Sequence, residues 1–255
     1  MEIGAQLFTA RKYSKTLEDF AETLKKVADM GYPTVQVSGT CPYEPQWLKE
    51  QLDKNGLRCV LTHPRKDYLL EDAAKVAENH HIFGCGCVGL ALPPDVWDLE
   101  KLENGFDEAY KEFKRLYKPV AQTIRENGCY LMYHNHATEF HKVNGKAILE
   151  HIAEAFSPEE LGFTLDTYWI QVGGGDPAWW IEHMYGRSPC IHIKDCGFGG
   201  RMEVIGEGNM NFDRIFEKAE SSGVQYMLVE QDNCNNEDPL DCLKRSYDYL
   251  RACGF

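Results

Sequence analysis

Short apolar runs alternate with longer amphipathic stretches along almost the whole chain, and this alternation is the feature that most restricts its fold. Runs rich in apolar and β-branched residues predict eight strands, near residues 4–8, 33–38, 57–62, 86–91, 129–134, 161–166, 188–193 and 225–230. Helical patterns such as 16–30 and 106–126 lie between them. In the second pattern, apolar side chains recur three or four residues apart, which predicts a buried face made of Phe106, Tyr110, Phe113, Leu116 and Tyr117.

Glycines and capping residues mark the predicted boundaries. Asp176-Pro177 and Asn211 are typical of helix starts. Several glycines stand between a helical pattern and the next strand, where a residue in the left-handed region often ends a helix; they are Gly31, Gly56, Gly128, Gly162 and Gly223.

Eight strands that alternate with helices in 255 residues predict an α/β fold, a single (β/α)8 TIM barrel that spans residues 1–255 as one domain. An open, doubly wound sheet is the alternative. It is disfavoured because the first strand runs into Thr9-Ala10-Arg11 and lacks a glycine-rich phosphate turn.

Composition narrows the class of partner. A formal charge of −13 with no long basic run repels phosphate backbones and anionic membranes, so we expect neither nucleic acid nor membrane as a partner. The first residues do not resemble a signal peptide, and several of the ten cysteines lie inside apolar strands. We therefore expect reduced thiols and a cytoplasmic protein. The aromatic-rich helices are compatible with a homo-oligomer.

Polar and ionisable residues follow five of the predicted strands, at the end where barrel enzymes carry their active sites. They are His63 after the third strand, His134, Asn135, His136 and Glu139 at the fifth, Asp166 at the sixth, His192 and Lys194 at the seventh, and Glu230 at the eighth. Such groups are costly to bury unless they are paired or bind a metal. Their recurrence at one end of the barrel predicts a functional site there.

Asp166, His192 and Glu230 combine oxygen and imidazole donors without a thiolate. That set suits a divalent ion, Mn²⁺ first and Mg²⁺, Co²⁺ or Zn²⁺ as alternatives. Neighbouring oxygens of a sugar could chelate such an ion, which would stabilise the enediolate formed when a carbon-bound proton is removed.

Several stretches of the chain together carry a family resemblance. They are Tyr133-His134-Asn135-His136-Ala137-Thr138-Glu139-Phe140, Leu165-Asp166-Thr167-Tyr168-Trp169, Ile191-His192-Ile193-Lys194-Asp195, Ile205-Gly206-Glu207-Gly208-Asn209-Met210-Asn211-Phe212 and Val229-Glu230-Gln231-Asp232, with Thr62-His63 in the N-terminal half. The chain resembles the xylose isomerase-like TIM barrel superfamily, which contains sugar phosphate isomerases and epimerases, inosose dehydratases and endonuclease IV-type nucleases.

The resemblance implies a metal held by Glu, Asp, His and Glu from the fifth to the eighth strand. Asp166, His192 and Glu230 match three of these positions. Epimerases of the superfamily end their fifth strand with the first Glu, whereas this chain has His134 or Asn135 there. Glu139 is the nearest carboxylate and is the expected fourth ligand, with His134 or His136 as the competing assignment.

For the reaction, the resemblance implies a metal-dependent isomerase or epimerase that acts on a ketose or related polyol ketone. Glu230 and Glu139 would move the proton, and Lys194, which shares a strand face with His192, would bind an anionic oxygen. If Glu139 does not reach the substrate, a lyase or dehydratase acting on a keto-inositol or 3-keto sugar is the alternative. A sugar-binding barrel without catalysis and a nuclease are weaker alternatives.

The expected walls of the substrate site are polar and aromatic side chains near the same strand ends. We expect His63, His134, Asn135, His136, Trp169 and Arg201 to contact a small sugar or polyol. Trp169 stands where many members of the superfamily carry a further His, and it offers an aromatic floor for a sugar ring instead.

Overall fold

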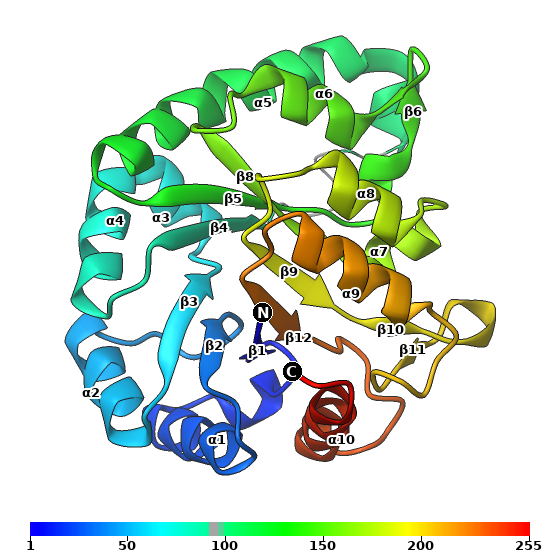
Figure 1. Ribbon diagram of the computed structural model, residues 1–255. Coiled ribbons are helices and arrows are strands. Elements are labelled where there is room, and N and C mark those ends of the chain that lie inside the picture. The colour runs from blue at the N-terminus through cyan, green and yellow to red at the C-terminus, as the bar shows by residue number, and fades with distance from the viewer. Residues whose placement is uncertain (92–96, 98) are drawn as a thin grey trace.

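The computed structural model describes residues 1–91, 97 and 99–255 and contains a closed eight-stranded barrel. All neighbouring barrel strands pair in parallel, and β1 pairs with both β2 and β12 to close the ring (Figure 1). The barrel strands are β1 (Glu2–Gln6), β2 (Thr34–Val37), β3 (Arg58–Thr62), β4 (Cys87–Ala91), β5 (Tyr130–His134), β8 (Leu161–Asp166), β9 (Cys190–Ile193) and β12 (Tyr226–Val229). Each overlaps a predicted strand, so the predicted (β/α)8 TIM barrel is confirmed.

Helices surround the strands on the outside of the barrel, as Figure 1 shows. They are α1 (Leu17–Asp29), α2 (Pro45–Asn55), α3 (Lys66–Glu71), α4 (Ala73–Ile82), α5 (Leu99–Glu126), α6 (Ile148–Ala155), α7 (Thr167–Val172), α8 (Pro177–His183), α9 (Phe212–Ser221) and α10 (Pro239–Ala252). Among the described residues, no helix is long and apolar enough to cross a bilayer.

Helix starts follow the predicted caps. The Asp176 carboxylate accepts hydrogen bonds from two amides in the first turn of α8, and Asn211 accepts one from Arg214 at the start of α9. The long α5 differs from prediction because it already begins at Leu99 and has a non-helical residue, Gly105, before the predicted start.

Alternate residues of each strand face two different cores. Outward-facing side chains such as Tyr133, Phe163 and Ile191 pack in the large core beneath the helices. Inward-facing Leu61, Met132, Cys190 and Leu228 form a separate buried cluster inside the barrel, which we call the lower layer. This two-residue periodicity follows from the pleat of a strand.

Two glycines make room for the lower layer. A Cβ at Gly4 would lie 2.6 Å from Leu228 Cδ2, and a Cβ at Gly162 would lie 2.7 Å from Met132 Sδ. Gly162 therefore lies within β8 as a packing residue, and its prediction as a helix-ending glycine is wrong. Gly31, Gly56, Gly128 and Gly223 do have positive φ angles, as predicted.

Two short hairpins extend from the strand ends that carry the predicted site. One pairs β6 (Lys142–Val143) with β7 (Lys146–Ala147), and the other pairs β10 (Asp195–Cys196) with β11 (Met202–Glu203). The 3-10 helices η3 (Thr138–Phe140) and η4 (Phe198–Gly200) lie in the same connections. All ten cysteines are free thiols, and most are buried.

Candidate metal centre and active site

Four ionisable residues meet inside the barrel, directly above the lower layer. His134 and Asp166 end β5 and β8, His192 lies in β9, and Glu230 follows the last residue of β12. The register pairs His192 with Asp166 on one side and with Leu228 on the other. Because the strands are parallel and neighbouring, their ends bring these side chains to one place, the upper layer (His134, Asp166, His192 and Glu230).

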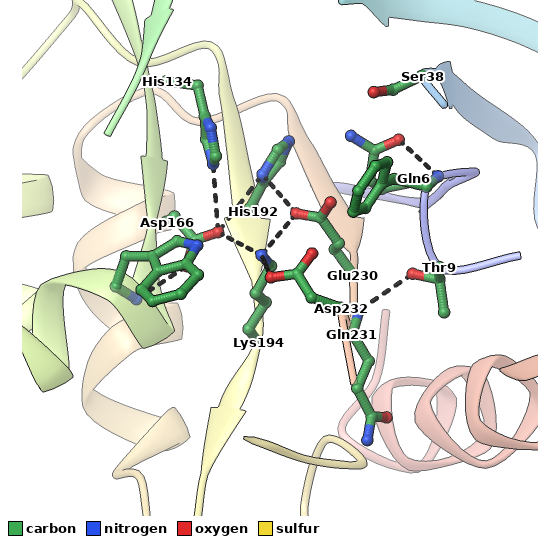
Figure 2. Close-up of polar contacts among 12 residues, drawn as sticks. Gln6, Thr9, Ser38, His134, Asp166, His192, Lys194, Glu230, Gln231 and Asp232 are labelled. Atoms are coloured by element: carbon green, nitrogen blue, oxygen red, sulfur yellow. Dashed lines mark hydrogen bonds and ion pairs between the residues drawn. The ribbon is translucent and has the colours of Figure 1, made fainter. Parts of the chain in front are cut away.

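One donor atom from each upper-layer residue lies within 4.8 Å of the others, and all four residues are buried. His192 Nδ1 is 2.9 Å from Glu230 Oε2 and 3.5 Å from Asp166 Oδ2, and His134 Nε2 is 3.3 Å from the same Asp166 oxygen (Figure 2). Two oxygen and two nitrogen donors thus converge on one point.

Lys194 adds a buried cation to the group. Its Nζ lies 3.0 Å from Asp166 Oδ2, 2.8 Å from Glu230 Oε2 and 2.8 Å from Asp232 Oδ2. Burial alone would lower the pKa of Lys194, but these three carboxylates outweigh it and raise the pKa. Three carboxylates around one ammonium leave the group with an excess of negative charge, and burial together with this excess raises the pKa of Asp232 to about 6.

The carboxylates of Asp166 and Glu230 are held ionised. Burial opposes the charge on Asp166 and Glu230, but Lys194 and the neighbouring imidazoles outweigh it and lower both pKa values. Burial similarly opposes a charge on His192, yet Glu230 and Asp166 raise its pKa because they favour positive charge at Nδ1. A metal ion at that point would replace the proton and use the same attraction.

The residues present fit a divalent metal ion. His192 Nδ1 and Glu230 Oε2 are buried, face the centre of the group and lie 2.9 Å apart, and Lys194 Nζ is the nearest cation, 2.8 Å from Glu230 Oε2. Two acceptor atoms so close together in a buried site are costly unless an ion or a proton lies between them. Two imidazoles, two carboxylates and an excess of negative charge match the needs of Mn²⁺, Mg²⁺, Co²⁺ or Zn²⁺.

Gln36 fixes the orientation of His192. The Nε2 of His192 lies 2.6 Å from Oε1 of Gln36 in β2, a strand separated from β9 by β12 and β1. An amide oxygen can only accept, so the imidazole donates from Nε2 and leaves the lone pair of Nδ1 for the carboxylate side.

Asp166 is oriented by its own loop. Its Oδ1 accepts a hydrogen bond from the amide of Trp169 at 3.0 Å, while its amide donates to Asn135 Oδ1 at 3.0 Å. Oδ2 is then the oxygen that faces His134, His192 and Lys194. The side-chain amide of Asn135 thus acts on the backbone of Asp166.

Glu139 lies outside the upper layer. Its carboxylate accepts hydrogen bonds from the Tyr133 hydroxyl at 2.6 Å, the His136 amide at 2.8 Å and the Thr138 hydroxyl at 3.1 Å. It is buried in η3 by these contacts. The fourth donor of the group is instead His134, the competing assignment from the sequence.

Aromatic rings surround the upper layer at the strand ends. The ring of His63 lies 5.4 Å from that of His134 and 5.8 Å from that of His192 between centroids. His136 lies 4.7 Å from His134 and 5.6 Å from Trp169. Lys194 Nζ is 5.6 Å from the centre of the Trp169 ring. Four predicted substrate contacts are therefore brought together, namely His63, His134, His136 and Trp169.

Arg201 is not brought to this group. It follows η4, its side chain is 56% exposed, and its Nε pairs with Glu203 at 3.1 Å.

Sequence reasoning missed three nearby polar residues, Gln36, Gln6 and Asp232. Gln6 and Gln36 are fully buried at inward-facing positions of β1 and β2, and Asp232 pairs with Lys194. The signal was present, because a glutamine inside the apolar runs Ala5-Gln6-Leu7 and Val35-Gln36-Val37 is unusual in a strand buried on both faces.

Solved structures share this fold along nearly the full chain. A sugar phosphate isomerase/epimerase from Parabacteroides distasonis is 24% identical, with a TM-score of 0.82 over 99% of this chain and 94% of that one. A probable 3-DHS dehydratase from Bacillus anthracis is 16% identical, with a TM-score of 0.74 over 98% and 99%. An L-ribulose 3-epimerase is 16% identical, with a TM-score of 0.70 over 99% and 94%.

Among curated proteins, no sequence matches the chain. The family model described as xylose isomerase-like TIM barrel matches residues 24–253, which include every barrel strand except β1 and all four upper-layer residues. The chain therefore belongs to the xylose isomerase-like TIM barrel family.

Proposed function

We propose that the protein is a metal-dependent sugar isomerase or epimerase, in which His134, Asp166, His192 and Glu230 hold one divalent ion. The observation that carries this proposal is the buried ring of nitrogen and oxygen donors, with an excess of negative charge, at the mouth of the barrel. Mn²⁺ is the leading ion, with Mg²⁺, Co²⁺ and Zn²⁺ as alternatives. The names of solved structures with this fold, among them sugar isomerase/epimerases, agree with such chemistry.

The substrate is a ketose or related polyol ketone. When bound, the ion polarises the carbonyl group and offsets negative charge on the substrate oxygens. Glu230 is the base that removes a proton from the carbon beside the carbonyl, because its carboxylate is ionised and borders the site. Lys194 donates a hydrogen bond to the oxygen on which negative charge develops.

The rings around the upper layer orient the substrate. Trp169 offers a half-buried aromatic face for a sugar ring, and His63 and His136 offer ring nitrogens for hydroxyl groups. We retain Asn135 as a wall residue because its Nδ2 is buried without a partner. Arg201 remains a proposed substrate contact that requires movement of its hairpin away from Glu203.

The contacts of Glu139 favour a second candidate, a lyase or dehydratase on a keto-inositol or 3-keto sugar. Epimerisation by two carboxylates needs a second carboxylate on the opposite face of the substrate, and the oxygens of Glu139 are held by Tyr133, His136 and Thr138. A single base on one face suffices for β-elimination.

Exchange of substrate hydrogen with solvent tests the proposal. Metal-loaded protein is incubated in D₂O with a panel of ketoses and keto-inositols, and deuterium at carbon is followed by NMR while enone absorbance is followed in the ultraviolet. Deuterated sugar without enone supports the isomerase or epimerase, and enone supports the lyase. Neither signal with any substrate contradicts both. Glu139→Gln is the discriminating variant, because only the two-carboxylate mechanism requires its charge.

A further inference from the structure

A hollow lies beside the upper layer and has no part in the proposed chemistry. It has a volume of about 540 Å³ and lies among the connections after β2 and β3 and helices α3 and α4. Its walls include Ser38, Thr40, Tyr43, His63, Arg65 and Tyr68. We call it the side pocket. Its volume lies within the range of about 300–1,000 Å³ typical of small-molecule sites.

His63 joins the side pocket to the upper layer. Its ring lies against His134 and His192, and it also lines the side pocket. A Cβ at Gly89 would lie 2.3 Å from His63 Cδ2, so the glycine in β4 leaves the space that this ring fills. The Nδ1 of His63 lies 3.5 Å from the hydroxyl oxygen of Ser38. Figure 2 shows Ser38 near Gln6. The imidazole of His63 is therefore a wall that the side pocket and the upper layer share.

The side pocket has aromatic walls and little free charge. The guanidinium of Arg65 stacks on Tyr68, 4.8 Å from the ring centre, and pairs with Asp67 through Nε at 3.1 Å. Glu44 contributes a carboxylate at the exposed rim. Burial lowers the pKa of His80 to about 4, which keeps this lining imidazole neutral at physiological pH. A phosphate group would find no uncompensated cation among these lining residues.

We infer that the side pocket is a subsite for an uncharged ring attached to the reacting sugar, so that the substrate is a glycoside whose reacting sugar carries the ketone, and not a free or phosphorylated monosaccharide. The ring is an aromatic aglycone or a second sugar, because both present a neutral face that stacks on tyrosine. This inference rests on the proposed function only in where it places the reacting sugar. The contacts of the ring itself involve Tyr43 and Tyr68, far along the chain from the proposed ligands.

Cys41 supplies a probe that requires neither metal nor turnover. It lines the side pocket as a half-buried free thiol, while Cys253 is an exposed free thiol at the end of α10. The rate of alkylation of each thiol by N-ethylmaleimide is measured by peptide mass spectrometry. Added ligands are phenyl and methyl glycosides of α- and β-glucose and β-galactose, cellobiose, and glucose 6-phosphate.

We expect phenyl glycosides or cellobiose to protect Cys41 at concentrations roughly tenfold below the methyl glycosides, with Cys253 unaffected. Protection by phenyl glycosides alone assigns the ring as an aromatic aglycone, and protection by cellobiose alone assigns it as a sugar. Equal behaviour of methyl and ring-bearing compounds, no protection by any compound, or stronger protection by glucose 6-phosphate would each overturn the inference.

Two tyrosine variants provide a matched pair. Tyr68→Ala removes a side pocket wall, and Tyr185→Ala removes another exposed tyrosine, in the loop after α8. Tyr68→Ala should raise the protecting concentration of the ring compound about tenfold and leave that of the methyl glycoside unchanged. Tyr185→Ala should change neither. Because the ring contacts do not involve the metal, Tyr68→Ala should still change protection by the ring compound relative to the methyl glycoside in chelated protein, so failure of the metal proposal and failure of the subsite give different results.

Discussion

The lower and upper layers of the barrel interior share the strands β5, β9 and β12, yet they differ completely in chemistry. In β9 the lower layer contains Cys190, and the upper layer contains His192, two residues further along. On β12 the corresponding residues are Leu228 and Glu230. The lower layer is apolar and tightly packed, whereas the upper layer collects charge at the open end. Both are buried, so exposure does not separate them.

This difference shows what each end of the barrel contributes. Packing of the lower layer lowers the free energy of the folded state, while burial of the upper-layer charges raises it unless a counter-ion is present. Lys194 supplies one positive charge, and the proposed metal ion would supply the rest. Substitutions in the two layers should therefore have separable effects on function and stability.

The largest functional effect is expected from Glu230→Gln in the upper layer. Loss of the carboxylate base should lower turnover by at least about 10²-fold, since general base catalysis contributes roughly 10²–10⁴. Solvent deuterium exchange measures this rate. The variant should remain folded, because it removes a buried charge. Turnover close to that of the wild type would contradict the assignment of Glu230 as the base.

Leu228→Ala tests the lower layer on the same strand. Leu228 is fully buried, so truncation should lower the free energy of unfolding by about 3–5 kcal/mol, as for other buried leucines. Urea denaturation of the metal-free protein measures the loss. Metal stoichiometry of the remaining folded protein should not change. A stable variant that no longer binds metal would reverse the roles of the two layers.

His80 is a buried histidine outside both layers and shows what burial alone does to an imidazole. Its pKa is lowered to about 4, whereas a histidine in the unfolded chain has a pKa of about 6.5. The folded protein therefore binds this proton less readily than the unfolded chain does. Stability should therefore fall as the pH drops from about 6.5 to 4, by about 3 kcal/mol from this group. Denaturation at several pH values in chelator measures it, and His80→Gln should flatten the curve over that window.

Gln36→Leu is expected to have the smallest effect. It removes the acceptor that orients His192, and loss of such an indirect contact weakens metal binding by about 10- to 100-fold. Titration calorimetry with Mn²⁺ measures the affinity. Thr34→Val, two residues earlier on β2, is the control that should retain it. Equal affinity in both variants would show that Gln36 does not orient the ligand.

Much of the fold could be predicted because hydrophobic periodicity directly encodes strands and their faces. The same logic placed Asp166, His192 and Glu230 at neighbouring strand ends, where they do meet. Gly162 was misassigned because a glycine between a helical pattern and the next strand fits a helix end as well as a packing position at the start of that strand. Only the approach of Met132 shows which role applies.

The position of Glu139 could not be predicted, because it depends on the conformation of one loop. In η3 the carboxylate turns back to accept the His136 amide and the Tyr133 hydroxyl, contacts that no spacing rule specifies. Gln36 was missed for a related reason, since its partner His192 is 156 residues away. Side-chain direction in loops and pairing across the barrel are properties of the folded chain.

Metal content tests the central claim most directly. Wild type, Asp166→Asn, His134→Ala and Glu139→Gln are loaded with Mn²⁺, freed of excess ion and analysed by plasma mass spectrometry. We predict roughly one ion per chain in wild type and Glu139→Gln, and loss of the ion in Asp166→Asn and His134→Ala. No ion in wild type with any divalent metal, or retention in His134→Ala with loss in Glu139→Gln, would contradict the proposed upper-layer metal centre.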